Sequence, residues 1–184
     1  MNVSAFDLFK IGVGPSSSHT VGPMLAACLF AESLHADQSL SQVFDLTVEL
    51  FGSLGATGHG HGSVPAVVLG LMRHRPDRVE PSQTPATLEH IRESGKLSLL
   101  GRHDVWFDIE EDIVLHRRKK MQFHSNAMLF KAWARDNAVL SERTYYSVGG
   151  GFVLDEEEAS RSGSLALTRD PAPVPHAFDT GTKC

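Results

Sequence analysis

The segment at residues 11–20, Ile-Gly-Val-Gly-Pro-Ser-Ser-Ser-His-Thr, constrains the fold of this chain more than any other. Two glycines and a proline predict a tight turn, and five polar residues follow it without a break. An apolar pattern with helical spacing then predicts a helix over about residues 20–36. The first backbone N–H groups of a helix lack internal partners, and the helix dipole is positive at that end. We therefore expect a small carboxylate or phosphate to bind at this turn.

An ordinary capped helix is the alternative interpretation of this segment. Serine and threonine are common N-caps, and Pro23 suits a first helical turn. Capping needs only one hydroxyl, however, and gives no reason for His19. The segment also lacks the Gly-Lys-Ser/Thr ending of a nucleotide phosphate loop.

The composition excludes several classes of protein. The 184 residues suffice for one domain with a substantial core, or for one domain plus a tail. A net charge of −5 argues against nucleic acid as the main partner, and the basic run at residues 116–120 is interpreted as a solvated turn between strands. We find no signal-peptide order and no apolar run that could span a bilayer, so no membrane partner is expected.

Cysteine usage favours a reducing, cytoplasmic location. Cys28 and Cys184 form neither a disulfide framework nor a metal motif. Cys28 falls on the apolar face of the first long predicted helix, where we expect it to be a small core residue.

The patterns along the chain predict an α+β domain, with helices packed on a mostly antiparallel sheet. Asp136 and Asn137 indicate a hairpin turn. Thr84 is the expected N-cap of the last helix and Gly95 its end. Helices are expected at residues 4–9, 20–36, 64–73 and 85–94. Strands are expected at residues 43–54, 98–100, 104–109, 113–117, 127–135, 139–148 and 151–154.

We expect this domain to occupy residues 1–155. From about Asp155 an acidic run, a serine-rich stretch and three prolines follow. This composition predicts a Pro/Ser-rich linker or truncated tail over residues 156–184.

Residues 52–62, Gly-Ser-Leu-Gly-Ala-Thr-Gly-His-Gly-His-Gly, are expected to form a second glycine-rich loop between a strand and a helix. In an extended segment His59 and His61 would point the same way. Half of a metal site is an alternative, which the lack of a clear set of further ligands disfavours. A solvated structural histidine is another. Two glycine-rich loops, each with a histidine and each leading into a helix, favour a shared site.

Two further segments carry weaker signals. His124 and Asn126 lie two residues apart at a predicted strand start, where both can face one pocket. The alternative there is a turn in which Asn126 bonds its own backbone. Residues 145–152 contain three consecutive glycines, which indicate either close backbone approach or a bulge.

Together these segments resemble the β domain of bacterial iron–sulfur L-serine dehydratases, which is the N-terminal half of single-chain enzymes or the small subunit of two-chain enzymes. The resemblance covers roughly residues 3–155. It implies a fold similar to the allosteric substrate-binding domain of some phosphoglycerate dehydrogenases. The segments that carry it are residues 7–9, 11–24, 58–62, 123–126 and 145–152.

The resemblance further implies that L-serine is converted to pyruvate and ammonia, without pyridoxal phosphate, in serine catabolism and gluconeogenesis. A [4Fe–4S] cluster, ligated by an α domain or α chain and not by this chain, acts on the serine hydroxyl while the β domain closes over it. The expected partners are therefore L-serine and the α part, and a homo-oligomer is left open. Without the α part, this chain is expected to be inactive.

By motif match, the resemblance implies that His61 is the catalytic base. Ser63-Val64-Pro65 departs from the Thr-Asp of many members, and Ser125 stands where a proline is common. Cys184 is interpreted as an accident of truncation or frame. The residues implied to hold the substrate are Ser16, Ser17, Ser18, His19 and Thr20 at the carboxylate, with His124 and Asn126 completing the pocket.

A non-catalytic module that binds L-serine or another amino acid is the alternative function. The glycine-rich histidine loop favours catalysis, because binding an effector does not require a base. Metal-dependent hydrolysis is disfavoured by the thin ligand set.

Overall fold

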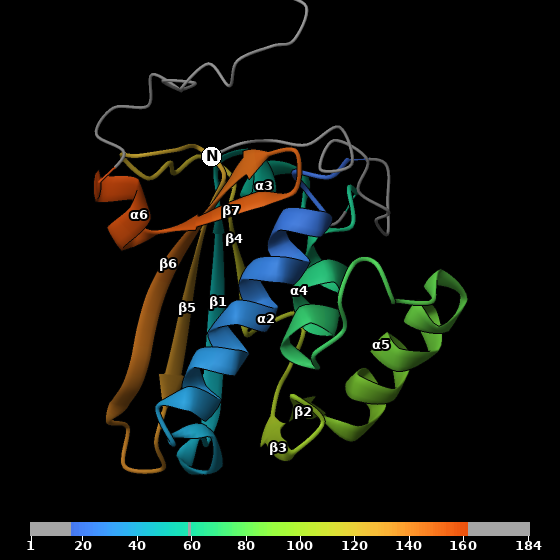
Figure 1. Cartoon of the computed structure of the whole chain (residues 1–184). Coiled ribbons are helices and arrows are strands. Elements are labelled where there is room, and N and C mark those ends of the chain that lie inside the picture. Colours follow the sequence, from blue (N-terminus) through green and yellow to red (C-terminus); the bar gives the residue numbers. More distant parts are fainter. Residues whose placement is uncertain (1–15, 59, 162–184) are drawn as a thin grey trace, which may run out of the picture.

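The computed structural model of this chain describes residues 16–58 and 60–161 (Figure 1). The predicted helix at 4–9, the glycine–proline turn at 11–15, His59 and Cys184 lie outside the described residues. Within the described part, no helix has the length and apolar character needed to cross a membrane.

A five-stranded sheet in the order β4-β1-β5-β6-β7 forms the centre of the fold. β1 pairs with β4 in parallel, and the other three pairs of this sheet are antiparallel. Helices pack on the sheet, so the expected α+β class is confirmed. The strands are β1 (Asp45–Phe51), β4 (Ile113–His116), β5 (Ala127–Trp133), β6 (Val139–Gly149) and β7 (Phe152–Asp155).

Two helices cover one face of this sheet (Figure 1). α2 (Val21–Ala36) contacts β5, β6 and β7, and α4 (Ser63–Leu71) packs beside α2. The core follows strand alternation, because Leu46, Val48 and Leu50 on β1 are fully buried and the residues between them are not. Each of these side chains contributes roughly 2 kcal/mol through burial. The helix expected at 20–36 is confirmed.

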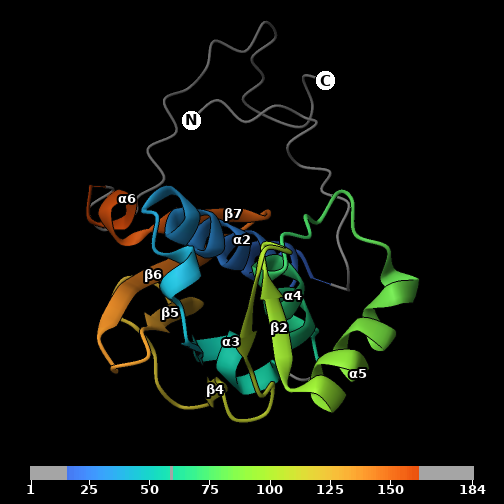
Figure 2. The ribbon, with the colours of Figure 1, turned by 90° about the horizontal axis from the view of Figure 1, so that it is seen from below.

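A smaller unit follows in the chain. α5 (Thr84–Ser94) lies on the side of the molecule away from β6 (Figure 2). Gly95 ends α5 with a φ of 63°, as predicted. The two-stranded hairpin of β2 (Lys96–Leu99) and β3 (His103–Trp106) comes next. Asn137, with a φ of 64°, forms the predicted hairpin turn between β5 and β6.

The expectation that Thr84 caps α5 is wrong. The short 3₁₀ helix η2 (Pro81–Gln83) runs directly into α5, so Gln83 takes the cap position and Thr84 is already helical. The hydroxyl of Thr84 is buried without a hydrogen-bond partner among the described residues. A second 3₁₀ helix, η1 (Leu40–Gln42), connects α2 to β1.

The glycine-rich segment after β1 is partly helical, which corrects the expectation of a strand to residue 54 followed by a loop. β1 ends at Phe51, and α3 (Gly52–Thr57) begins immediately. Gly52 has a φ of 59°, and a Cβ atom there would lie 1.9 Å from the backbone oxygen of Ser125. The sharp turn from β1 into α3 therefore requires glycine.

Regular structure continues past residue 155, where we expected the linker to begin. α6 (Glu156–Arg161) follows β7 and packs on β6 and β7, with Ala159 buried. The packed fold therefore extends at least to Arg161. The domain boundary and the tail remain predictions.

Candidate active site

Four segments with polar side chains meet at one edge of the sheet. β1 and β6 end there and β5 begins there, because β5 is antiparallel to both. The turn at residues 16–20 precedes α2 at the same edge, since Ser147 of β6 donates its hydroxyl proton to the backbone oxygen of Ser18 at 2.8 Å. Figure 1 shows α3 and β7 at this edge, at the top of the view.

The turn at residues 16–20 brings the hydroxyl groups of Ser16 and Ser18 to the ring of His19. The Ser18 hydroxyl lies 3.0 Å from Nδ1 of His19 and 3.0 Å from the Ser16 hydroxyl. The Ser17 hydroxyl makes no hydrogen bond within the described residues. Thr20 is 1% exposed and donates its hydroxyl proton to the backbone oxygen of Ser16, so it holds the turn from within.

At the start of α2 the N–H groups of Thr20 and Gly22, which we expected to be free for an anion, are bonded to the preceding turn. The N–H groups of His19 and Thr20 donate to the Ser16 carbonyl, and that of Gly22 donates to the Ser17 carbonyl. Pro23 has no N–H group to offer. Thr20, at the cap position, makes no side-chain capping bond either. An anion at this turn would therefore meet side-chain donors more than the helix backbone.

His19 is held in a half-buried position beside His61. Their ring centroids are 5.3 Å apart in an edge-to-face arrangement. Burial, followed by the proximity of His61, lowers the pKa of His19, and a hydrogen bond with the backbone of Ser53 acts in the opposite direction. The lowered pKa favours the neutral form of the His19 ring.

His61 lies on an exposed turn between α3 and α4. Its N–H group donates to the backbone oxygen of Thr57 at 3.0 Å, at the end of α3. Gly62 follows with a φ of 80°, and a Cβ atom there would lie 3.4 Å from the Thr20 side chain. The segment is not extended at residues 60–62, because the chain turns there to enter α4, so the condition under which His59 and His61 would point the same way is not met there. The turn at residues 16–20 and the segment at residues 60–62 lie side by side, through His19 and His61 and through Thr20 and Gly62.

Asn126 is tied to the start of α3. The Ser53 hydroxyl donates to Oδ1 of Asn126 across 73 residues of sequence. The contact depends on Gly52, which lets the β1–α3 turn approach the backbone of Ser125. Asn126 therefore lies near the turn at residues 16–20, since the backbone of Ser53 also contacts the His19 ring.

His124 is not placed beside the other two histidines by any contact within the described residues. Its Nδ1 atom accepts a hydrogen bond from the backbone N–H of Asn126 at 3.1 Å, so the ring folds back on its own segment. This differs from the turn that the sequence suggested, in which the Asn126 side chain would bond its own backbone.

Ser147 is a site residue that sequence reasoning missed. It is fully buried, and its N–H group donates to the backbone oxygen of Asn126 at 2.9 Å while its hydroxyl binds Ser18. The only signal in the sequence was its place just before the three glycines. These have φ values of 98°, 59° and 77°: Gly149 ends β6, and Gly150 and Gly151 form the turn into β7, while the irregularity in the β6–β7 pairing lies just before them, between Ser147 and Gly149.

The described residues do not fit an iron–sulfur cluster, which needs a set of cysteine thiolates. Cys28 is the one cysteine among them, and it is buried in the core, as expected. Burial, followed by the nearby Glu32, raises its pKa to about 11. No group of three or more His, Cys, Asp or Glu side chains in residues 16–58 and 60–161 is arranged to hold a metal ion.

Comparison with known proteins supplies the family. The family described as serine dehydratase beta chain matches residues 4–158. An L-serine dehydratase of Streptomyces coelicolor is 48% identical over 98% of this chain and 39% of its own length. L-serine dehydratase 2 of Escherichia coli K12 is 40% identical over 99% of this chain and 40% of its own length.

This chain thus spans about two fifths of the length of these relatives. The match to the family covers the turn at residues 16–20, the α3–α4 segment, and the strand ends that carry Asn126 and Ser147. The chain belongs to the serine dehydratase beta chain family.

Proposed function

We propose that this chain is the β part of an L-serine dehydratase, which converts L-serine to pyruvate and ammonia together with an α part. The observation that carries the proposal is the pairing of an exposed imidazole, His61, with a half-buried and hydrogen-bonded one, His19, beside a turn of serine hydroxyls. The names of the relatives support the substrate and the reaction.

In this proposal His61 removes the α-proton of L-serine. An imidazole titrates near neutral pH and is suited to general-base catalysis. His61 is exposed and is bordered by Gly60 and Gly62, so its ring can reach a reactant bound at the edge of the domain. Loss of the α-proton and of the serine hydroxyl leaves an enamine, which tautomerises and is hydrolysed to pyruvate and ammonia.

The turn at residues 16–20 would bind the substrate carboxylate. Ser17 has the hydroxyl with no competing bond within the described residues, so it is the first donor we assign. Ser16 and Ser18 flank it, and His19 fixes the orientation of the Ser18 hydroxyl through Nδ1. Thr20 would support this turn from within through its bond to the Ser16 carbonyl.

Asn126 and His124 would complete the pocket at the start of β5. If the Ser53 hydroxyl occupies Oδ1 of Asn126, the amide nitrogen is left to donate toward the substrate. His124 would act through Asn126, because its Nδ1 atom accepts a hydrogen bond from the backbone N–H group of Asn126.

The α part would hold a [4Fe–4S] cluster that activates the serine hydroxyl. The described residues of this chain offer no set of ligands for a cluster, so we propose that all of its ligands come from the partner. A fold similar to the allosteric substrate-binding domain of phosphoglycerate dehydrogenases, self-association and a cytoplasmic location belong to the same proposal.

Anaerobic formation of pyruvate from L-serine tests the proposal, using this chain alone and mixed with a separately purified, cluster-loaded α chain. We expect pyruvate to form only when the two chains are mixed. His61→Ala should lower kcat at least roughly 100-fold. The matched control is His90→Ala, because His90 is exposed on α5, away from the candidate site.

Near-normal turnover by His61→Ala would contradict the role of His61. No activity in either preparation would contradict the catalytic proposal. Tight binding of L-serine by the isolated chain would then indicate a binding module instead.

A further inference from the structure

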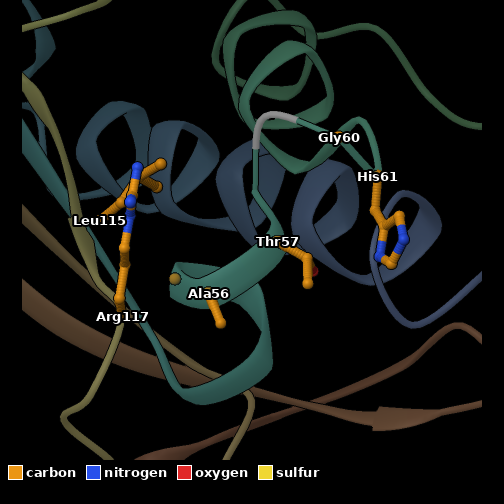
Figure 3. A pocket seen from close by; sticks show the side chains of 7 residues that line it. Ala56, Thr57, Gly60, His61, Leu115 and Arg117 are labelled. Atoms are coloured by element: carbon orange, nitrogen blue, oxygen red, sulfur yellow. The ribbon is translucent and has the colours of Figure 1, made fainter.

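A cavity of about 350 Å³ lies on the β4 side of α3, next to the candidate active site. Figure 3 shows Leu115 and Arg117 on one side, His61 on the other, and Ala56 and Thr57 between them. The volume is at the lower end of the range for small-molecule sites in proteins.

Two glycines line this cavity, and each is there for a different reason. A Cβ atom at Gly55 would lie 2.5 Å from the Leu50 carbonyl oxygen and 2.6 Å from that of His116, so α3 can lie close against β1 and β4 only with glycine there. At Gly60 a Cβ atom would meet nothing nearer than the Thr57 carbonyl oxygen at 3.9 Å. A side chain at residue 60 would have free space, and glycine leaves that space to a ligand.

Arg117 is the one arginine or lysine in the lining, and its guanidinium group supplies a positive charge. Its guanidinium group makes no ion pair within the described residues, and no acidic side chain lines the cavity. The neighbouring Arg118, Lys119 and Lys120 are exposed, so the local potential attracts anions although the whole chain is acidic. The backbone oxygen of Lys119 accepts a hydrogen bond from Gly52 at 2.8 Å, which anchors this basic segment beside α3.

We propose that this cavity is a binding site for a short aliphatic carboxylate, with Arg117 as the anchor of the carboxylate group. A guanidinium group binds a carboxylate through two parallel hydrogen bonds. The aliphatic body of the ligand would contact Ala56 and Leu115. The apolar contacts with Ala56 and Leu115 favour a carboxylate with an aliphatic body over inorganic phosphate, which has none.

His61 borders both this cavity and the candidate active site. Its turn is attached to the end of α3 through the Thr57 carbonyl oxygen. A ligand in the cavity therefore contacts the same turn that carries the proposed base. The binding site goes beyond the proposed reaction and does not depend on it.

NMR titration of the full chain with isobutyrate tests the site, with isobutyramide as the neutral isostere and inorganic phosphate as the alternative anion. We expect saturable binding of isobutyrate in the millimolar range, with shifts at Gly55 and Ala56. Isobutyramide should bind at least roughly 10-fold more weakly, because it cannot form the charge-assisted pair.

Arg117→Gln should weaken isobutyrate binding at least roughly 10-fold, and Arg118→Gln by less than about 2-fold. Both residues are exposed, and each substitution removes one positive charge. The pair of variants therefore separates a specific carboxylate anchor from general electrostatic attraction of anions. Ala56→Leu should fill the cavity and reduce binding, whereas Ala86→Leu, at another exposed alanine, on α5, should not.

Absence of saturable isobutyrate binding would overturn the proposal. Equal losses in Arg117→Gln and Arg118→Gln would overturn it as well, and tighter binding of phosphate would overturn the assignment of a carboxylate. Since no turnover is measured, these outcomes are independent of whether the chain takes part in serine dehydration.

Discussion

His19 and His61 each lie in a turn that leads into a helix, yet the surroundings of the two rings differ. His19 is half-buried, contacts two serine hydroxyls and bonds the backbone of Ser53. His61 is exposed, has a glycine on each side and is attached through its backbone N–H. Burial and several bonds fix a ring in place, whereas exposure leaves a ring able to reach a reactant. The contrast supports a structural and binding role for the first histidine and a chemical role for the second.

Gly52→Ala should have the largest effect, because it disrupts the β1–α3 turn beside His19. A Cβ atom would lie 1.9 Å from the Ser125 backbone oxygen at a φ of 59°, so we expect the free energy of unfolding to fall by about 3 kcal/mol or more. Gly101→Ala is the matched control, because Gly101 has a φ of 64° but nothing within 4 Å of its Cβ position. That control should lose only about 1 kcal/mol.

Urea unfolding of both variants separates the close approach from the backbone conformation. Equal losses of unfolding free energy in the two variants would show that the close approach to Ser125 does not affect stability. In that case the β1–α3 turn would not be what sets the distance between Ser53 and Asn126.

Gly22→Ala should destabilise the turn that carries His19, because it displaces the Ser147 side chain. The new Cβ atom would lie 2.1 Å from the Ser147 hydroxyl oxygen, which then has to leave the Ser18 carbonyl. We expect a loss of about 2 kcal/mol in the free energy of unfolding. Because Ser147→Ala removes the clashing oxygen, the double variant should lose less than the sum of the two single variants. Strictly additive losses in this double-mutant cycle would contradict the contact.

His19→Ala and His61→Ala compare the two rings directly. His19→Ala should cost about 1 to 2 kcal/mol in the free energy of unfolding, because it removes a half-buried ring and its hydrogen bonds. His61→Ala should stay within about 0.5 kcal/mol of the unaltered chain, because its ring is exposed. The measurement is urea unfolding at pH 7, and a larger loss for His61→Ala would reverse our assignment of fixed and free ring.

Local patterns in the sequence were enough to predict much of the fold. The apolar spacing of α2 and the left-handed residues Gly95 and Asn137 depend on neighbouring residues alone, and the structure confirms them. α3 was missed, because two of its six residues are glycines with low helix propensity. Its position depends on close contact with β1 and β4, through the Leu50 and His116 carbonyl groups, which no local pattern encodes.

The residues of the candidate site show the same difference between local and long-range signals. The hydroxyl turn and the glycine–histidine segment stand out because unusual residues are consecutive in the sequence. Ser53 and Ser147 are single serines whose partners lie 73 and 129 residues away, at Asn126 and Ser18. Only the pairing of β5 with β1 and β6 brings these residues together, so a single sequence gives no means of finding them.

The smallest predicted effect concerns the pH dependence of stability, and it isolates His19. Its pKa in the folded chain is lowered below its ordinary value of 6.5, mainly by burial. The stability that comes from a neutral His19 is therefore fully present above 6.5. It is lost as the pH falls below 6.5, because the unfolded chain then binds a proton more readily than the folded chain. His19→Gln should reduce the drop in Tm between about pH 7.5 and about pH 5.5 by roughly 1 to 3 °C. His90→Gln, at an exposed position on α5, is the control and should keep the full drop. An unchanged drop in His19→Gln would mean that the His19 ring is as well solvated as that of His61, and the contrast between the two turns would not hold.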